Sequence, residues 1–599
     1  MVQNRTCRLL LVNRDLLITL LTPLLLSPIP IVYKTALSKC LYILLLMLVY
    51  LLLESLPLAI VGLLPAVAFP LLGIMDAATL GKAYFSDQLL FIIGVLIISS
   101  AVERTDLHKR VVLRSLLLFG SNPYGLLLGT FIISGFLSMW LPNVAMMSMM
   151  LPIGQALGAE LDRQMEEKNT DMEELGTVGE KGEIIANQAV ADDLKNVVIV
   201  EDSKKQEKER LTESNRKKPI ITSYLLLSMG YGNTIGGSAT LIGTIVPIVA
   251  NAQLSRIYGP DSVIEFDAWI QFGLPLQLAC LTLAYIWLVF LMWISLRKQR
   301  RNKAGRSQDE DDTKQSGGGD DKVKQYVRSE YAKLGGMKWS EVVTIFLMST
   351  YVLLLFFADL QFMKGWKSLF PKGYTSNTCI TCGIAILLFI IPYDKPNCRT
   401  PRSTKKHGTI LEWRYVSNKL PWELVLIIGG YFALAEGIRD SGISSTLEGY
   451  FEENVGDQEP WVILLILTVT LAIATELMSN VPVVIITFPI IASLASATSV
   501  NPLYYIVSSV FAVNLTFMLP ISAPPIMILY TSGSVTVLDM LKAGWMMNIM
   551  TILLLNVFIN TYGYVIFDFD TMPAWAIKDT TTMASPLTNI TNESSTLLG

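Results

Sequence analysis

Long apolar runs, separated by short polar segments, dominate the chain. A transmembrane helix needs about 20 predominantly apolar residues, and about eleven runs come close to that length. These runs cover residues 16–33, 40–56, 57–74, 87–102, 220–251, 269–296, 341–362, 377–393, 421–438, 503–531 and 543–566. The pattern predicts an all-α polytopic membrane protein with about eleven transmembrane helices.

Two further apolar stretches each contain an asparagine at a central break. The first is "SMWLPNVAMMSMMLPIG", in which Pro142 lacks a helical hydrogen-bond donor and Asn143 adds an amide that is costly to bury unpaired. The second is "TELMSNVPVVIITFPI", with Asn480 at the matching place; in both stretches a proline follows the asparagine by nine residues. Broken backbone is tolerated at membrane depth where it lines a cavity enclosed by protein. We therefore interpret both stretches as re-entrant hairpins.

Each hairpin is followed by a span with small and polar residues at its centre, "IGGSATLIGTIVPI" after the first and "FMLPISAPPIMIL" after the second. Glycine alone would indicate only close helix packing. The whole set instead indicates two inverted repeats, with a binding site between broken helices. Half-helix N-termini favour an anion there, and exposed carbonyl and amide oxygens favour a cation.

The charge distribution predicts the orientation and excludes nucleic acid as a partner. Charged residues make up 16% of the chain and the net charge is −3, so the expected surroundings are a lipid bilayer. The positive-inside rule places the charged loops in the cytoplasm, the N-terminus in the cytoplasm and the C-terminus outside. Sequons at Asn589 and Asn592 fit an extracellular, glycosylated tail.

These observations divide the chain into nine predicted segments. They are 1–120, N-terminal spans and an interfacial helix (mostly scaffold); 121–160, the first re-entrant hairpin; 161–219, a cytoplasmic charged loop; 220–296, a broken span and the following span; 297–340, a second cytoplasmic charged loop; 341–458, spans of the second repeat (mostly scaffold); 459–500, the second re-entrant hairpin; 501–567, a broken span and the last span; and 568–599, the extracellular tail.

Six ordered motifs make the chain resemble the divalent anion/sodium symporter family, which includes sodium-coupled citrate, dicarboxylate and sulfate transporters. The motifs are "AYFSDQLLFIIGV", "FLSMWLPN", "IGGSATLIGT", "NPLYYIV", "FMLPISAPP" and "FDFDTMPAWA". The resemblance runs from about residue 10 to 577 and leaves out the charged loops. It implies an elevator-type transporter in the plasma membrane, a homodimer, a small anionic substrate and coupled sodium ions.

The resemblance also implies which residues bind ligands. Substrate would be bound by Asn143, Val144, Thr244, Ser479, Asn480, Val481, Ala523 and Pro524. Sodium would be bound by Ser138, Asn143, Gly243, Thr475, Asn480 and Ser522, in part through backbone carbonyls.

The tips depart from the family's Ser-Asn-Thr pattern. The first tip reads Pro142-Asn143-Val144 and has neither hydroxyl, whereas the second reads Ser479-Asn480-Val481 and keeps one. Sodium is held by oxygen ligands, so lost hydroxyls weaken its binding. We therefore expect weaker sodium coupling than in relatives with complete motifs.

The leading hypothesis is a secondary active transporter of small di- and tricarboxylates such as succinate, malate or citrate. A sulfate transporter of the same family is the first alternative, and a transporter-like receptor that binds without transporting is the second. An enzyme is not expected, because the two histidines, His108 and His407, lie in basic stretches away from the apolar runs. Glu476 is a carboxylate within an apolar run, and we expect it to orient the second tip.

Overall fold

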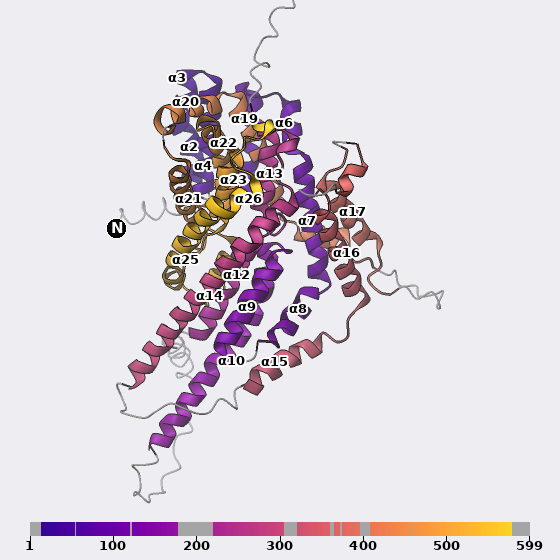
Figure 1. The fold of residues 1–599 in the computed structure, drawn as a ribbon, viewed down its shortest axis with the longest axis vertical. Coiled ribbons are helices and arrows are strands. Elements are labelled where there is room, and N and C mark those ends of the chain that lie inside the picture. Colours follow the sequence, from indigo (N-terminus) through magenta and orange to yellow (C-terminus); the bar gives the residue numbers. More distant parts are fainter. Residues whose placement is uncertain are drawn as a thin grey trace, which may run out of the picture.

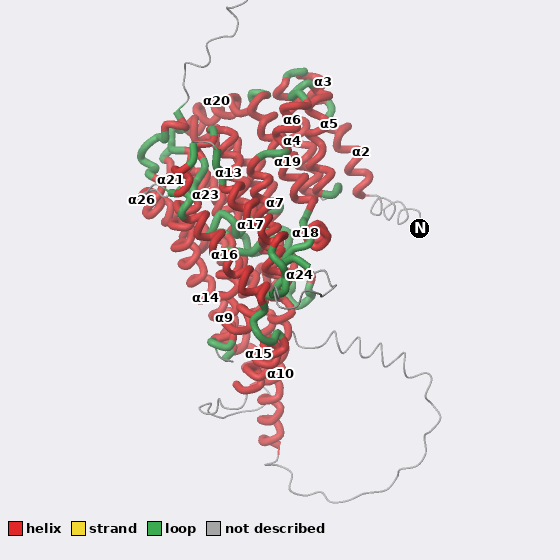
Figure 2. The backbone as a smooth tube through the Cα atoms, turned by 90° about the vertical axis from the view of Figure 1, so that its right-hand side faces the viewer, coloured by secondary structure: helices red, strands yellow, loops and turns green. Residues whose placement is uncertain are grey.

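The computed structural model describes residues 14–53, 55–119, 122–177, 220–304, 320–359, 365–371, 374–395, 408–456 and 458–577. The regular structure of these residues is helical, apart from an isolated antiparallel bridge between Pro392 and Thr409. Figures 1 and 2 show the helices gathered into one elongated bundle. The all-α prediction is confirmed.

One group of helices comes from the first part of each half of the chain. Helix α5 packs against α19 and α7 packs against α17, so segments far apart in sequence share a core. Gly62 of α5 allows close approach, because a Cβ there would lie 2.5 Å from the Cα of Ile427. This scaffold group contains α2 (Arg14–Leu26), α3 (Pro28–Tyr33), α4 (Ala36–Leu53), α5 (Leu58–Leu72), α6 (Ala77–Tyr84), α7 (Asp87–Arg104), α16 (Trp339–Phe356), α17 (Asn377–Ile390), α18 (Trp413–Lys419) and α19 (Trp422–Asp440).

The second group, here called the hairpin group, holds the interrupted segments. Its first half is α9 (Pro123–Ser138), α10 (Asn143–Thr177), α12 (Ile220–Gly237), α13 (Ile245–Tyr258) and α14 (Phe266–Ala304). Its second half is α21 (Pro460–Leu477), α22 (Asn480–Ala497), α23 (Pro502–Asn514), α24 (Pro524–Thr531), α25 (Val537–Phe558) and α26 (Tyr564–Phe567).

The two halves of the hairpin group are packed crosswise. Helix α24, the last part of the second broken span, contacts α10 of the first hairpin. Helix α13, the last part of the first broken span, contacts α22 of the second hairpin. Each half therefore packs the last part of its broken span against the hairpin of the other half, as expected of two inverted repeats.

The helices are interrupted at the four places where the sequence predicts a break. Residues 139–142 link α9 to α10, and residues 478–479 link α21 to α22. Non-helical residues 238–244 and 515–523 divide the two broken spans. Local sequence explains the first link, because Pro142 cannot donate a backbone hydrogen bond and Asn143 begins the next helix.

The number of spans and the start of the charged loops differ from the prediction. Among the described residues, nine helices are long and apolar enough to cross a membrane, or up to ten when the bent pair α18 and α19 is one span. The predicted count of about eleven is therefore not confirmed. Helix α10 continues to Thr177 and α14 to Ala304, past the loop boundaries predicted at 161 and 297. Charge ends an apolar run but does not end a helix, because Glu, Lys and Arg are good helix formers.

Three short amphipathic helices complete the α-helices of the described residues, which also contain the single turns Pro260–Ser262, Trp366–Leu369, Ile559–Gly563 and Ala574–Ala576. The three helices are α8 (Leu107–Leu116), α15 (Asp320–Lys333) and α20 (Ile443–Val455). Helix α8 lies within the segment 1–120, for which the sequence predicts an interfacial helix, and contacts α15. Its His108 is buried, with Nδ1 3.2 Å from the carbonyl oxygen of Val102, and burial lowers the pKa of the imidazole.

Candidate functional site

The tip of the first hairpin is fixed by a small polar network. The hydroxyl of Ser138 lies 2.8 Å from Oδ1 of Asn143 and 2.5 Å from the carbonyl oxygen of Asn233. The side-chain amide of Asn233 in turn donates to the carbonyl oxygen of Asn143, at 2.8 Å. Hairpin and broken span are therefore joined by hydrogen bonds at the point where α10 begins.

Two glycines at the first break make room for this network. A Cβ on Gly237 would lie 2.5 Å from Oδ1 of Asn143 and 2.8 Å from the hydroxyl of Ser138. A Cβ on Gly243 would lie 2.7 Å from the carbonyl oxygen of Ser138 and would also collide with that of Gly237. The structure thus brings the predicted residues Ser138, Asn143 and Gly243 together, with backbone carbonyls and an amide oxygen among their closest groups.

The second break is organised by Glu476. Its carboxylate accepts hydrogen bonds from the backbone N–H groups of Phe517, Met518 and Leu519, at 2.9 to 3.2 Å. The side chain of Asn548 on α25 donates to the same carboxylate, at 2.6 Å. Sequence reasoning expected Glu476 to orient the adjacent tip; the structure shows that its hydrogen bonds go to the break of the second broken span and to α25.

The other predicted residues of the second half are buried beside this carboxylate or close to it in sequence. Thr475 bonds back to the carbonyl oxygens of its own helix, and the hydroxyl of Ser522 donates to the carbonyl oxygen of Leu519. Asn480 begins α22, and its Oδ1 is buried without a hydrogen-bond partner. In the part of the chain that the structure describes, no hydrogen bond joins the side chains of Thr475, Asn480 and Ser522 to one another. Their common sodium site stays a prediction.

All predicted substrate-binding residues lie at helix N-termini. Asn143 and Val144 open α10, and Thr244 is the residue before α13. In the second half, Ser479 precedes Asn480 and Val481 at the start of α22, and Ala523 precedes Pro524 at the start of α24. The side chains of Thr244, Ser479 and Ala523 make no capping hydrogen bond. The N-termini of α10, α13 and α22 therefore keep backbone N–H groups and a partial positive charge available for an anion. Helix α24 begins with Pro524 and Pro525, which have no N–H, and contributes only the partial positive charge of its dipole.

The breaks and tips also carry buried side-chain oxygens that lack a hydrogen-bond partner. Three of them are Oγ1 of Thr244, Oδ1 of Asn480 and Oγ1 of Thr516. A fourth, Oδ1 of Asn233, belongs to the residue whose amide binds the first tip. A buried polar atom without a partner is costly, and such atoms at a helix break indicate a place for a ligand.

Sequence reasoning missed Asn233, Thr240 and Asn548. Thr240 lies inside the first break, where its hydroxyl donates to the carbonyl oxygen of Met139, at 2.5 Å. Asn233 precedes Gly237 by one helical turn, and this spacing was a visible signal that both face the tip. Asn548 gave no comparable signal, because it lies 72 residues from its partner Glu476 in an otherwise ordinary span.

A family model for the "sodium:sulfate symporter transmembrane region" matches residues 9–569 of the chain. The chain belongs to the sodium:sulfate symporter family. The family is one of transporters and not of enzymes, so this chain is a multi-pass secondary active transporter of that family.

Curated relatives cover nearly the whole length of this chain. The Na(+)/dicarboxylate cotransporter 3 of Rattus norvegicus is 33% identical over 96% of this chain and 97% of its own. The Na(+)/citrate cotransporter of Mus musculus is 34% identical over 93% of this chain and 96% of its own. The YdaH transporter of Alcanivorax borkumensis aligns with 89% of this chain and 100% of its own at 11% identity, with a TM-score of 0.45, too low to support an argument from that structure.

Proposed function

We propose that this symporter carries small di- and tricarboxylates such as succinate, malate and citrate across the plasma membrane. The observation that carries the proposal is the placement of the predicted substrate residues at the N-termini of α10, α13, α22 and α24. The first two termini meet at Gly237, because a Cβ there would lie 2.5 Å from Asn143 and 2.8 Å from a methyl group of Thr244. In the first repeat two anion-favouring helix ends therefore lie together, and the N-termini of α22 and α24 are their counterparts in the second repeat.

A pair of N-termini from each repeat suits a substrate with two separated anionic groups. Succinate, malate and citrate each carry at least two carboxylates, and one carboxylate could face each repeat. Sulfate is a single compact anion and could face only one pair closely. The relatives named for dicarboxylate and citrate are 33–34% identical to this chain. The family model is named for sulfate, so sulfate remains the second candidate.

We propose that sodium is bound at the first break and that its coupling is weaker than in the named cotransporters. The carbonyl oxygens of Ser138 and Gly237 lie against Gly243, and Oδ1 of Asn143 lies against Gly237. This oxygen-rich set fits a hard cation, and unwound backbone carbonyls are ligands that transporters use for sodium. The tip has Pro142 and Val144 at the two positions where hydroxyl groups would supply further oxygen ligands. The expected affinity for sodium is therefore lower.

The proposed mechanism moves the hairpin group against the scaffold group in a homodimer whose C-terminus is extracellular. Contacts between the two groups are polar as well as apolar. Arg256 of α13 donates to the carbonyl oxygens of Phe432 on α19 and Ala83 on α6, at 3.0 and 2.7 Å. Lys367, between α16 and α17 of the scaffold group, forms an ion pair at 3.1 Å with Glu265, which directly precedes α14 of the hairpin group. Such contacts can hold one position of the hairpin group and must be released for the movement.

The test is uptake of labelled succinate, citrate and sulfate by cells expressing the full chain. We expect saturable uptake of succinate or citrate that the other carboxylate inhibits, and little uptake of sulfate. Asn143→Ala should abolish this uptake at equal surface expression, whereas Asn454→Ala, at an exposed position on α20, should not. Uptake of sulfate alone would favour the second candidate. Saturable binding without uptake of any of the three would favour a receptor.

A further inference from the structure

One face of α14 carries an exposed stripe that changes from apolar to basic along the helix. Its apolar side chains are 40–58% exposed and belong to Ile286, Phe290, Trp293 and Ile294. Its basic side chains continue the same face at helical spacing and are also exposed: Arg297, Lys298 and Arg301. The opposite face is buried against the protein, at Leu288, Met292 and Leu296. The stripe therefore points away from the bundle.

The stripe lies where α14 leaves the membrane. The candidate span of this helix runs from Phe266 to Gln299, so the apolar part of the stripe faces lipid. In Figure 1, α14 runs toward the lower end of the molecule, as α10 does. Tryptophan is enriched at the boundary between hydrocarbon and headgroups, and Trp293 lies one helical turn before Arg297. The stripe therefore passes from the acyl chains to the headgroups of one leaflet.

The charge of this helix end is positive and uncompensated. Residues 297–303 contain five basic residues, and no Asp or Glu occurs from Ala268 to Ala304. In the part of the chain that the structure describes, no carboxylate forms an ion pair with Arg297, Lys298 or Arg301. A cluster of about four to eight Lys and Arg residues directly beyond a transmembrane helix attracts anionic lipids. Charge complementarity therefore favours an anionic lipid over a zwitterionic one.

Two aromatic rings support the first basic side chain of the stripe. The guanidinium of Arg297 lies 5.1 Å from the centroid of the Trp293 ring, in a cation–π contact. The rings of Trp293 and Phe290 are stacked, with their centroids 6.5 Å apart. A guanidinium that stacks on an aromatic face keeps its N–H groups free to bind a phosphate through two parallel hydrogen bonds. The contact therefore prepares Arg297 for a phosphate where the apolar part of the stripe ends.

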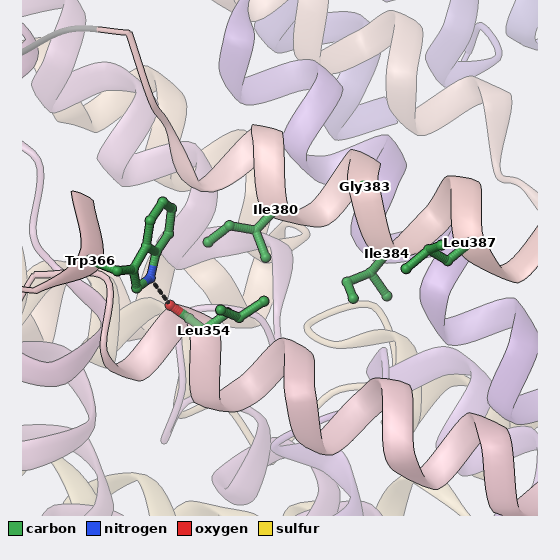
Figure 3. A pocket seen from close by; sticks show the side chains of 6 residues that line it. All are labelled: Leu354, Trp366, Ile380, Gly383, Ile384 and Leu387. Atoms are coloured by element: carbon green, nitrogen blue, oxygen red, sulfur yellow. Dashed lines mark hydrogen bonds between the residues drawn. The ribbon is translucent and has the colours of Figure 1, made fainter. Parts of the chain in front are cut away.

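An apolar surface with a tryptophan does not by itself lead to this conclusion, as the pocket in Figure 3 shows. That pocket, between α16 and α17, has a volume of about 310 Å³ and is lined by Leu354, Trp366, Ile380, Gly383, Ile384 and Leu387. The indole N–H of Trp366 donates to the carbonyl oxygen of Leu354, at 2.8 Å. These lining residues carry no charge, so they do not select a headgroup, unlike the stripe of α14.

We propose that the stripe from Ile286 to Arg301 binds an anionic phospholipid. The headgroup phosphates contact the basic part, and the acyl chains lie along the apolar part. Five positive charges within two helical turns fit a multiply charged headgroup, such as that of phosphatidylinositol bisphosphate, better than a singly charged one. Helix α14 belongs to the hairpin group, so a bound lipid contacts the part of the protein that we propose to move. The proposal does not depend on which anion the protein transports.

The experiment titrates the purified full chain in detergent with dioctanoyl phosphatidylinositol bisphosphate and measures bound lipid by native mass spectrometry. We expect saturable binding. Dioctanoyl phosphatidylserine should bind more weakly, because its headgroup carries less charge, and dioctanoyl phosphatidylcholine should show no saturable binding. Inositol trisphosphate lacks acyl chains and separates a lipid from a free phosphate. It should bind roughly tenfold more weakly or less, because it leaves the apolar part of the stripe uncovered.

Neutral variants of the basic residues test the location of the site. Arg297→Gln, Lys298→Gln and Arg301→Gln together should lower the affinity roughly a hundredfold. The matched control also removes three exposed positive charges, but from places that do not share a helix face: Lys34→Gln, Lys82→Gln and Lys109→Gln. This control should leave the affinity unchanged.

A further variant tests the aromatic support. Trp293→Leu keeps the surface apolar and removes the ring beside Arg297, so it should lower the affinity severalfold. Unchanged affinity in this variant or in the triple variant, or equal binding of phosphatidylcholine or inositol trisphosphate, would overturn the proposal. A wild-type dimer that the triple variant does not form would also overturn it, because a second copy would then cover the stripe. No transport measurement is needed, so failure here is separate from failure of the proposed function.

Discussion

Oε1 of Glu476 lies 2.6 Å from the side-chain nitrogen of Asn548, which joins the second hairpin to α25 through one buried carboxylate. The same carboxylate accepts the backbone N–H groups of Phe517, Met518 and Leu519. These N–H groups belong to the break between α23 and α24 and have lost their helical partners. Glu476 therefore replaces the missing helical acceptors and holds the break in one conformation.

Replacing this carboxylate should loosen the break. In Glu476→Gln, one of the two acceptor oxygens becomes a donor that faces backbone N–H groups, so hydrogen bonds are lost and the charge is removed. We expect the free energy of unfolding to fall by about 1.5–3 kcal/mol and uptake to fall with it. Thermal unfolding in detergent and uptake at equal surface expression measure the two effects. Glu459→Gln, at the exposed start of α21, is the control; equal stability of both variants would show that the carboxylate is not needed.

The close packing around Gly237 predicts that adding a single methyl group there strongly reduces uptake. In Gly237→Ala the new Cβ would lie 2.5 Å from Oδ1 of Asn143, so the tip must move. We expect uptake to fall roughly tenfold or more at unchanged surface expression. Gly81→Ala is the matched control, because a Cβ on this glycine of α6 has nothing within 4 Å. Normal uptake by the Gly237 variant would remove this glycine and its neighbours from the transport site.

A buried ion pair fixes α8 against the scaffold group. Nε of Arg110 lies 2.8 Å from Oε2 of Glu341, and both side chains are almost fully buried. Arg110→Met should destabilise the protein by about 3–5 kcal/mol, because it leaves a buried carboxylate unpaired. The double variant with Glu341→Met should recover the part of that loss that comes from the unpaired carboxylate. It should not recover the hydrogen bonds of Arg110 to the carbonyl oxygens of residues 334–336, and thermal unfolding of all four proteins would measure both parts. A double variant less stable than Arg110→Met would contradict the argument.

The predicted orientation rests on charge and on two sequons outside the described residues. If the C-terminus is extracellular, Asn589 and Asn592 can be glycosylated. Glycosidase treatment should then shift the mobility of the wild-type protein, and Asn589→Gln with Asn592→Gln should abolish the shift. An epitope at residue 599 should be accessible to antibody on intact cells. Access only after permeabilisation would place the C-terminus in the cytoplasm and reverse the orientation.

The local sequence was sufficient to predict where the helices break, but not which contacts stabilise the breaks. Proline, glycine and serine at residues 238–244 and 515–523 directly oppose a continuous helix, so both breaks could be predicted. The partners of Glu476 lie 41 to 72 residues away, and only the packing of α21 against α23 and α25 brings them together.

Sodium dependence of uptake tests the central claim most directly. Each coupled sodium ion supplies roughly 1.4 kcal/mol per tenfold gradient, plus about 2.3 kcal/mol per 100 mV for its charge. Strong coupling therefore makes uptake depend steeply on the external sodium concentration. Labelled succinate or citrate uptake should be measured against external sodium, with choline as the replacement ion. We predict substantial uptake in choline and a shallow rise with sodium, which Pro142→Ser with Val144→Thr should steepen. Steep, sigmoidal sodium dependence with inward current in the wild-type protein would contradict the account.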